Sequence, residues 1–439
     1  MPVFEDLSPK QQKIIQSRVP EFLILAGPGT GKTEILAHRI VDIINNDRDV
    51  EPDEILALTF SRRATSEMRN RLDEFTEVDT SDVKISTIHA ESLRIYYQLE
   101  GSRKYILDKD ESTMIIRDTL NDNGFLSRVR DINNLRKDIS ISKTSNILPE
   151  EIMKDGSNDE SFIKLYEHYE QLLDYHNAMD FDDVILKPVR MLNGVQYDRG
   201  IKHLLIDEFQ DINTLEFTML QILGKNVEGL FIVGDDDQSI YGFRGANPTL
   251  IKTISKYYPA CNIDCLEETH RCCEHIIRGA LEIVSRDKNY VPKSIHSARG
   301  IGNPIKFLIT RSEDAEARWI AQWIFEKVNE GYVEPHKIGI LSKSLAMIPP
   351  VLDELNRRNI DVAQYVSGGI FRHRPVRDIL SVARLMLDHD DNLAFKKCLS
   401  TNLASGIGKI SIQELRNIAE KKRVNYWDVL SSIDDYSSL

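Results

Sequence analysis

The 439-residue sequence predicts an α/β protein built on a mostly parallel, doubly wound β-sheet. Three observations support this fold class. Short apolar runs alternate with helical patterns, a long charged helical stretch interrupts the alternation, and a second, weaker alternation follows. Because buried parallel strands read as short apolar runs, the sequence predicts a sheet domain with a helical insertion, followed by a partial second domain of the same class.

Four apolar runs predict the strands of the first sheet. The run "EFLILAG" (21–27) ends in glycine and precedes the helical pattern "KTEILAHRIVDII", so it predicts a buried strand, a turn and a helix. The other runs are "ILALTF" (55–60), "HLLID" (203–207) and "LFIVGD" (230–235). Their alternation with helices implies a sheet that is covered on both faces.

The alternation stops between His89 and about Asp180. Charged, helix-like segments such as "SFIKLYEHYEQLLDYH" dominate there, and we find no convincing strand pattern. We therefore expect a helical insertion within the first α/β domain.

A second α/β pattern begins after about residue 280. Its expected strands are "IKFLI" (305–309), "IGIL" (338–341) and "VAQYV" (362–366), and the chain is helical in pattern from Arg374 onward. Three strands are few for an independent domain of this class, so this second sheet is expected to be incomplete.

Composition narrows the class of protein. The net charge of −13 counts only weakly against nucleic acid, because a basic groove can lie on an acidic protein. No apolar run approaches the ~18 residues of a membrane span. Five cysteines and an N-terminus without a signal-peptide pattern favour the reducing cytoplasm.

The stretch "AGPGTGKT" (26–33) matches a phosphate loop, with alanine where the strict pattern has its first glycine. Glycines let backbone N–H groups curl around an anion, and the following helix start adds partial positive charge. Lys32 would reach the β- and γ-phosphates of ATP, and Thr33 would hold Mg²⁺. An ordinary glycine-rich turn is the alternative. The expected nucleotide contacts here are Ala26, Gly27, Pro28, Gly29, Thr30, Gly31, Lys32, Thr33, Glu34 and Arg39.

"HLLIDEFQD" supplies the second half of this site. Asp207 ends a buried strand, where a carboxylate is expected when a cation such as Mg²⁺ offsets its burial. Glu208 follows and is placed to orient and deprotonate an attacking water. A solvated strand end is the alternative for the pair taken alone, but together with Lys32 it predicts a Mg²⁺ ligand and a catalytic base.

Further stretches fall in order around these two, and together they resemble the UvrD/Rep/PcrA-like superfamily 1 DNA helicases. The matches are "LSPKQQKII" to the Q motif, "ALTFSRRATSEM" to motif Ia, "STIHAESL" to motif Ib, "LLIDEFQD" to motif II, "FIVGDDDQSIYGFRGA" to motif III and "LEETHRCCEHII" to the place of motif IV. "VSGGIFRHRPVRDILSVARLML" resembles the segment that follows, and "GIGKISIQEL" resembles the entry to the 2B insertion.

The resemblance implies RecA-like phosphate-loop NTPase domains. The expected bounds are 1–89 for the first part of domain 1A, 90–179 for the helical 1B insertion, 180–279 for the second part of 1A, 280–398 for a partial 2A domain, and 399–439 for the start of a helical 2B-like insertion.

The resemblance also implies roles at the ATP site. Gln11 is the expected adenine contact, Gln238 would sense the γ-phosphate, and Arg271 would reach it from motif IV. His270 stands where the family has a tyrosine that stacks on adenine. The expected catalytic residues are therefore Lys32, Glu208, Gln238 and Arg271, with Mg²⁺ held by Thr33 and Asp207.

Motifs Ia, Ib and III imply contact with single-stranded DNA. Tyr241 and Phe243 have π-faces on which bases can stack, worth roughly 1–3 kcal/mol per base. The family usually has tryptophan where Phe243 stands. The alternatives are core packing for these two rings and a solvated helix face for "SRRATSEMRNR". The expected DNA contacts are Thr59, Phe60, Arg62, Thr87, His89, Tyr241, Phe243 and Arg244.

The family's motifs V and VI, the second of which supplies an arginine to the γ-phosphate, are not found in the sequence. Three explanations stay open: a fragment of a larger helicase whose missing C-terminal segment supplies these motifs, a naturally short relative completed by another protein, and a degenerate protein that binds ATP and DNA without translocating.

The leading functional prediction is an ATP-dependent, 3′→5′ DNA helicase or translocase that acts on single strands and duplex junctions. The alternative is an ATP-responsive DNA-binding or regulatory module without motor activity. A phosphate-loop kinase or GTPase does not explain "DEFQD" together with "GDDDQSIYGFRGA".

The stretch "LEETHRCCEHII" also suggests a metal site, since Cys272 and Cys273 lie between His270 and His275. Adjacent residues on a helix point about 100° apart, so both cysteines cannot easily face one ion. We therefore expect the cysteines to be small buried hydrophobic residues.

Overall fold

The computed structural model describes residues 7–76, 78–125, 128–152, 159–195, 197–288, 290–363, 373–399, 409–422 and 424–432. The chain forms two compact units. The first comprises residues 1–303, 390–393 and 409–439, and the second comprises residues 304–389 and 394–408. No helix among the described residues is both long and apolar enough to cross a bilayer.

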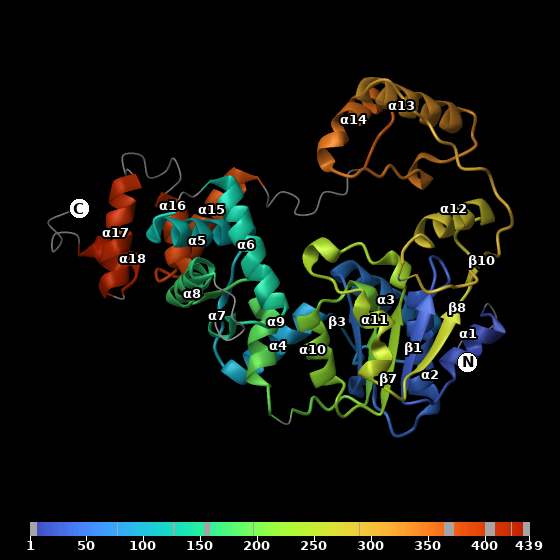
Figure 1. The fold of residues 1–439 in the computed structure, drawn as a ribbon, viewed down its shortest axis with the longest axis horizontal. Coiled ribbons are helices and arrows are strands. Elements are labelled where there is room, and N and C mark those ends of the chain that lie inside the picture. Colours follow the sequence, from blue (N-terminus) through green and yellow to red (C-terminus); the bar gives the residue numbers. More distant parts are fainter. Residues whose placement is uncertain are drawn as a thin grey trace. The chain divides into compact units, whose positions relative to one another are not determined.

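A six-stranded parallel sheet forms the centre of the first unit (Figure 1). Its order is β3-β2-β6-β7-β1-β8, and the strands are β1 Glu21–Ala26, β2 Ile55–Thr59, β3 Lys84–Thr87, β6 His203–Ile206, β7 Gly229–Gly234 and β8 Asn262–Leu266. All four predicted strands are present and occupy the middle of the sheet. The sequence did not predict β3 and β8, because edge strands are partly exposed and need not be apolar.

Helices cover both faces of this sheet, which confirms the doubly wound prediction. One face packs against α1 Pro9–Ile15, α2 Lys32–Asn46 and α3 Arg62–Phe75. The other packs against α4 Ile88–Glu100, α9 Asp183–Met191, α10 Thr214–Leu223 and α11 Thr249–Lys252. Beyond the edge strand β8, the pair β9 Glu268–Thr269 and β10 His296–Ser297 brackets α12 Glu274–Val284.

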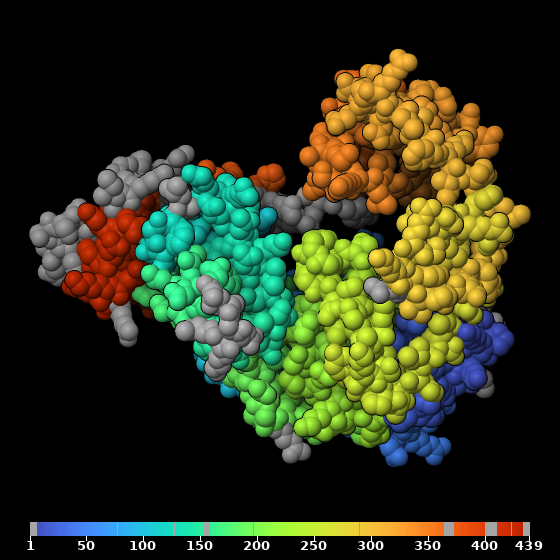
Figure 2. All heavy atoms as spheres, in the orientation of Figure 1, coloured from blue at the N-terminus to red at the C-terminus, as the bar shows by residue number. Residues whose placement is uncertain are grey.

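The helical insertion is present as predicted, and Figure 2 shows its atoms packed continuously against those of residues 180–260. Its helices are α5 Lys109–Asp122, α6 Val129–Thr144, α7 Pro149–Ile152 and α8 Glu160–Tyr175. The insertion also holds one short parallel pair, β4 Tyr105–Ile106 with β5 Ala178–Met179, which the sequence did not predict.

Two helices from the far end of the sequence pack on this insertion. They are α17 Lys409–Lys422 and α18 Tyr426–Ser431. Arg416 is buried between Asp118 and Asp122 of α5, and the Tyr175 hydroxyl donates to the Val424 carbonyl oxygen at 3.0 Å. Of the predicted 2B entry segment, residues 406–408 lie outside the described residues.

The second unit contains α13 Glu313–Asn329, α14 Pro349–Asn356 and α15 Arg374–Leu387, and α16 Asn392–Leu399 spans a boundary between the units. Its small core joins Ala321 and Ile324 of α13 to Leu355 of α14. This unit is therefore held together by helix packing in its described part.

The predicted strands of the second unit are wrong for 305–309 and 338–341, which form no strand. Phe307 is 89% exposed and Leu341 is 98% exposed. An apolar run becomes a strand only where a neighbouring strand completes its hydrogen bonds, and no described residue of this unit supplies one. Residues 364–366 of the third run, and 366–372 of the motif-like segment after it, lie outside the described residues.

Candidate nucleotide and nucleic-acid sites

Residues 27–31 form a loop between β1 and α2, as the phosphate-loop pattern predicts. Gly29 and Gly31 have positive φ angles of 75° and 90°, which side chains rarely tolerate, and Gly31 is the residue from which α2 begins. The Thr30 hydroxyl donates to the Gly27 carbonyl oxygen at 2.9 Å and closes the loop. The loop therefore presents a helix N-terminus, with its free N–H groups, toward an anion site.

The segment 269–271 lies directly on this loop. The Thr269 hydroxyl donates to the Pro28 carbonyl oxygen at 2.6 Å, and the His270 N–H donates to the Gly29 carbonyl oxygen at 3.0 Å. A Cβ atom at Gly29 would lie 2.3 Å from the Cβ of Arg271. Glycine is thus required at position 29 both for its backbone angle and for the close approach of Arg271.

Two contacts join the start of α2 to the end of β6. The Lys32 Nζ lies 3.2 Å from the Glu208 Oε2, and the Thr33 hydroxyl donates to the Asp207 Oδ2 at 3.1 Å. Thr33 and Asp207 are 174 positions apart in the sequence, and the whole insertion lies between them. The residues predicted to act together are therefore adjacent in space.

Asp207 has the properties of a cation ligand. Burial, and then the Glu208 charge beside it, raise the pKa of this carboxyl to about 6. A carboxylate and a hydroxyl are the oxygen ligands that Mg²⁺ prefers, and a bound cation would offset the cost of burying this charge. The residues present therefore fit Mg²⁺.

Glu208 is held in an unusual conformation. Its φ of 51° and ψ of 46° are left-handed, a strained choice for a non-glycine residue and one found mostly at functional sites. The Gln210 amide donates to the Glu208 Oε2 at 2.8 Å, and the Asp235 N–H donates to the Gln210 Oε1 at 2.8 Å. Motifs II and III are thereby connected through side chains.

Two adjoining hollows lie over the phosphate loop, of about 220 and 390 Å³. The smaller is lined by Pro28, Gly29, Gly31, Lys32, Thr33, Ala64, Glu67, Arg71, Asp207, Glu208, Gln238 and Arg271. The larger is lined by Leu7, Gln11, Gly29, Gly31, Glu34, Arg71, His270 and Arg271. The structure thus brings all four predicted catalytic residues to one hollow, and Gln11, Glu34 and His270 to the other.

The predicted nucleotide contacts differ in their access to these hollows. Gln11 is fixed by its amide, which donates to the Thr30 carbonyl oxygen at 3.2 Å. Arg39 is not brought to the site. It is buried on α2, donates to the Ile15 carbonyl oxygen, and lies 5.6 Å over the Phe231 ring. Its position in the second turn of α2 turns it toward the core rather than the loop.

Arg71 is a site residue that the sequence did not predict. It lies on α3, pairs with Glu67 at 2.9 Å, and lines both hollows. It lies more than two helical turns beyond the start of α3, away from the end of strand β2 where motif Ia begins. Nothing in its local pattern distinguishes it from a solvated arginine.

The motif Ia and motif III aromatic residues form one cluster. The Phe60 and Tyr241 ring centroids are 5.0 Å apart, and those of Tyr241 and Phe243 are 5.9 Å apart. The Arg244 guanidinium lies 5.1 Å over the Tyr241 ring. Phe243 is 79% exposed, so it is not a core residue. We call Phe60, Tyr241, Phe243 and Arg244 the aromatic cluster.

The other predicted DNA contacts separate into exposed and structural residues. Arg62 is exposed at the start of α3, whereas Thr59 is buried and its hydroxyl lies 2.7 Å from that of Thr65. The Thr87 side chain caps α4 by accepting from the Ala90 N–H at 3.2 Å. Thr59 and Thr87 therefore shape the backbone, and Thr59 has no accessible surface to offer a ligand.

His89 stacks on Phe181, an aromatic residue that the sequence did not single out. Their ring centroids are 4.1 Å apart at 20°. Burial lowers the pKa of His89 to about 4, so the ring is neutral at ordinary pH. Phe181 is 61% exposed and lies at the junction of the insertion with the sheet domain. The Phe181 ring therefore presents an exposed aromatic face, which we call the Phe181 platform.

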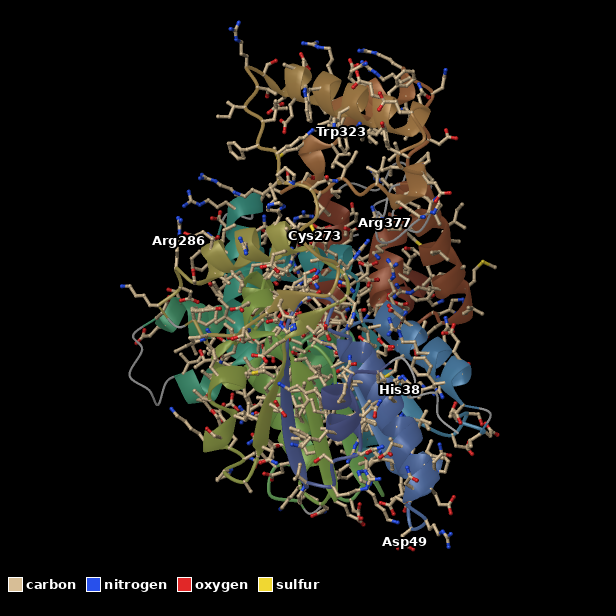
Figure 3. The ribbon with its side chains drawn as sticks, turned by 90° about the vertical axis from the view of Figure 1, so that its right-hand side faces the viewer. His38, Asp49, Cys273, Arg286, Trp323 and Arg377 are labelled. Carbon is tan, nitrogen blue, oxygen red and sulfur yellow. The ribbon has the colours of Figure 1, made fainter. Side chains whose placement is uncertain are left out.

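The described cysteine- and histidine-rich stretch brings no group of three or more metal-type ligands together. Cys272 and Cys273 form no disulfide and are only partly buried, so the prediction of fully buried cysteines is wrong for this pair. Among the described residues, Asp235, Asp236 and Asp237 are the only metal-type ligands that gather in a group of three or more. Figure 3 shows Cys273 near the start of α12, and a Cβ at Gly302 would lie 2.2 Å from its sulfur. Packing therefore accounts for this cysteine.

Comparison with known families agrees with this geometry. Residues 7–259 match the UvrD/REP helicase N-terminal domain, and residues 265–438 match the UvrD-like helicase C-terminal domain.

Curated relatives extend the match along nearly the whole chain. The ATP-dependent DNA helicase PcrA of Leuconostoc citreum is 28% identical over 438 residues, which cover 97% of this chain and 58% of the relative. The ATP-dependent DNA helicase Rep of Buchnera aphidicola subsp. Acyrthosiphon pisum (strain APS) is 29% identical, with 94% and 65% covered. PcrA of Bacillus subtilis (strain 168) is 27% identical, with 98% and 59% covered. The chain thus spans about three-fifths of the length of these relatives, and none of these matches supports the expected additional partner protein.

Proposed function

This chain belongs to the UvrD/REP helicase family, and we propose that it hydrolyses ATP to move along single-stranded DNA. One observation carries the proposal. The turn after β7 places Gln238 in the nucleotide hollow, and three residues later it places Tyr241 in the aromatic cluster. A shift of Gln238 when the γ-phosphate is lost would therefore move Tyr241 as well, because both residues belong to the same turn. The expected direction of movement is 3′→5′, and the expected substrates are single strands and their junctions with duplex.

Each residue of the hollow has a separate role in ATP hydrolysis. The loop N–H groups bind the phosphates, and Lys32 and Arg271 neutralise the charge that develops as the γ-phosphoryl group is transferred. Glu208 accepts a proton from the water that attacks the γ-phosphorus, and the bond to ADP breaks. Thr33 and Asp207 would hold Mg²⁺, which supplies further charge neutralisation when bound.

Single-stranded DNA would bind across the aromatic cluster and the Phe181 platform. Bases stack on the exposed rings without regard to sequence, while Arg62 and Arg244 offer positive charge to the backbone. We place the protein in the cytoplasm, because Cys261, Cys265, Cys272 and Cys273 form no disulfide.

The alternative of a regulatory module without turnover is not favoured. Lys32 pairs with Glu208, and the Glu208 N–H donates to the Asp207 Oδ1. A protein that only binds ATP needs no strained carboxylate beside the phosphates. The strain at Glu208 is better explained by a catalytic base.

ATP turnover with and without single-stranded DNA tests the proposal. In the wild type we expect DNA to stimulate turnover. Glu208→Gln should lower the stimulated rate by about 10²–10⁴-fold, because it removes the base but keeps the shape. Glu282→Gln is the matched control, since this glutamate is exposed on α12 and pairs with Arg286 on the same helix. Turnover that ignores DNA, or that survives Glu208→Gln, contradicts the proposed mechanism.

A further inference from the structure

Lys293 is a buried lysine that no step described so far uses. It lies on the segment between α12 and β10, and its side chain is 1% exposed. The Nζ atom lies 3.0 Å from the Asp235 Oδ1 and 2.8 Å from the Asp237 Oδ2, and it also contacts Asp236. These are the three consecutive carboxylates of motif III.

The cluster keeps Lys293 charged although it is buried. Burial alone would lower the pKa of this ammonium, but the neighbouring carboxylates, first of all Asp235, raise it above its ordinary value. A buried charge is stable only when paired and hydrogen-bonded. Lys293 and the three aspartates therefore depend on one another for their positions.

Asp235 is the point at which this cluster meets the nucleotide hollow. The Gln238 amide donates to the Asp235 Oδ2 at 2.5 Å, while the Oδ1 accepts from Lys293. The Asp235 N–H donates to the Gln210 Oε1, and the Gln210 amide donates to the Glu208 Oε2. A continuous chain of contacts thus runs from Lys293 to Gln238 and, by a second branch, to Glu208.

The segment that carries Lys293 is itself fixed to the phosphate loop. A Cβ at Gly27 would lie 2.6 Å from the Ile295 Cδ1, so Ile295 packs directly on the loop. The Ala298 N–H donates to the Thr269 carbonyl oxygen at 3.0 Å, and the Ser297 hydroxyl donates to the Cys272 carbonyl oxygen at 2.7 Å. Residues 293–298 therefore touch the phosphate loop, motif III and motif IV together.

We propose that Lys293 is a positioning residue for ATP hydrolysis, which holds Asp235 so that Gln238 and Glu208 face the nucleotide. This role rests on the proposed ATPase function. Lys293 touches neither hollow, so it acts on turnover through Asp235 and Gln238 rather than on the binding of ATP.

The test compares kcat, the KM for ATP and the affinity for a fluorescent ATP analogue in four variants of the full chain at saturating single-stranded DNA. Lys293→Met should lower kcat by ~10–100-fold with KM and analogue affinity changed less than about threefold, because a small misplacement of catalytic groups costs rate. Lys293→Arg keeps the charge and should recover turnover to within about threefold of the wild type. Lys256→Met, at an exposed lysine of the same unit, should change nothing.

Lys293→Met removes a positive charge from beside the buried Asp235 and Asp236, which could impair folding. A second variant therefore separates loss of position from misfolding. Lys293→Met combined with Asp236→Asn removes one charge of each sign and keeps Asp235. It should fold, as checked by its thermal unfolding midpoint, and still show the ~10-fold or greater loss of kcat, since Asp235 has lost its anchor.

Wild-type kcat in the folded double variant overturns the positioning role, as does a loss confined to KM or analogue affinity. A wild-type protein without DNA-stimulated turnover overturns the proposed function itself, and this role with it. The two failures are thus distinguishable.

Discussion

The nucleotide hollow and the aromatic cluster lie at the carboxyl edge of one sheet but are built in opposite ways. In the hollow, the polar side chains contact one another before any ligand binds: Lys32 pairs with Glu208, and Thr33 donates to the buried Asp207. In the cluster, the Phe243 ring is exposed and the Arg244 guanidinium lies 5.8 Å from its centroid. The first arrangement fixes geometry for chemistry, and the second offers surface to bases.

This difference predicts which quantity each substitution changes. Changes in the hollow should alter ATP binding or turnover and leave DNA affinity in place. Changes in the cluster should weaken DNA binding and leave basal turnover in place. The predictions below are ordered from the largest expected effect to the smallest.

Gly29→Ala should have the largest effect, confined to ATP. The new Cβ meets Arg271 at 2.3 Å in a backbone of φ 75°, so the loop must distort at a cost of more than ~2 kcal/mol. We expect ATP affinity to fall at least ~30-fold, measured with a fluorescent analogue. Gly200→Ala is the matched control, because its φ is 66° but nothing lies within 4 Å. Equal losses of ATP affinity in the two variants would show a general effect of a strained backbone, and not an effect of the contact with Arg271.

Replacing both Tyr241 and Phe243 with alanine should affect only DNA. Loss of stacking costs ~1–3 kcal/mol per base, so we expect the affinity for labelled oligonucleotide to fall by at least ~10-fold. Basal ATP turnover without DNA should stay within about twofold of the wild type. Tyr257→Ala is a suitable control, since this ring packs edge-on against Phe217 away from the cluster. A parallel loss of basal turnover would mean that the two sites are not built separately.

Phe181→Ala should produce a smaller loss of the same kind. One ring that stacks on His89 is removed, and a single platform is worth ~1 kcal/mol or more. DNA affinity should fall several-fold, as measured by fluorescence anisotropy. Phe125→Ala, at another exposed phenylalanine of the first unit, is the control. If the two variants bind DNA equally well, Phe181 does not contact the strand.

Arg39→Lys should have the smallest effect on ligands. The guanidinium binds the Ile15 carbonyl oxygen inside the unit, so we expect unchanged ATP affinity within about twofold and a loss of stability of ~1 kcal/mol. Thermal unfolding and analogue binding measure the two quantities. A clear loss of ATP affinity at unchanged stability would show that Arg39 contacts the nucleotide after all.

The sequence predicted those parts of the fold and site that local patterns encode. The central strands β1, β2, β6 and β7 were recognised because strands buried on both faces must be apolar throughout. The edge strands β3 and β8 were not predicted, because edge strands are partly exposed and need not be apolar. In the second unit, apolar runs resembled strands but found no partner among the described residues, because pairing is decided by neighbours and not by composition.

The same distinction separates the predicted site residues from the missed ones. Lys32 and Asp207 stand at fixed positions in motifs next to predicted strands. Arg71, Phe181 and Lys293 instead gain their positions from tertiary packing that brings distant segments together. Arg39 shows the reverse error, since proximity along α2 to the phosphate loop did not place its side chain near the loop.

The coupling of the two sites through the turn after β7 is the central claim, and one titration tests it most directly. ATP turnover is measured against single-stranded DNA concentration for the wild type and Gln238→Ala, with oligonucleotide affinity measured in parallel. The account predicts that Gln238→Ala binds DNA as the wild type does but loses most of the stimulation. An undiminished stimulation in Gln238→Ala would contradict the account.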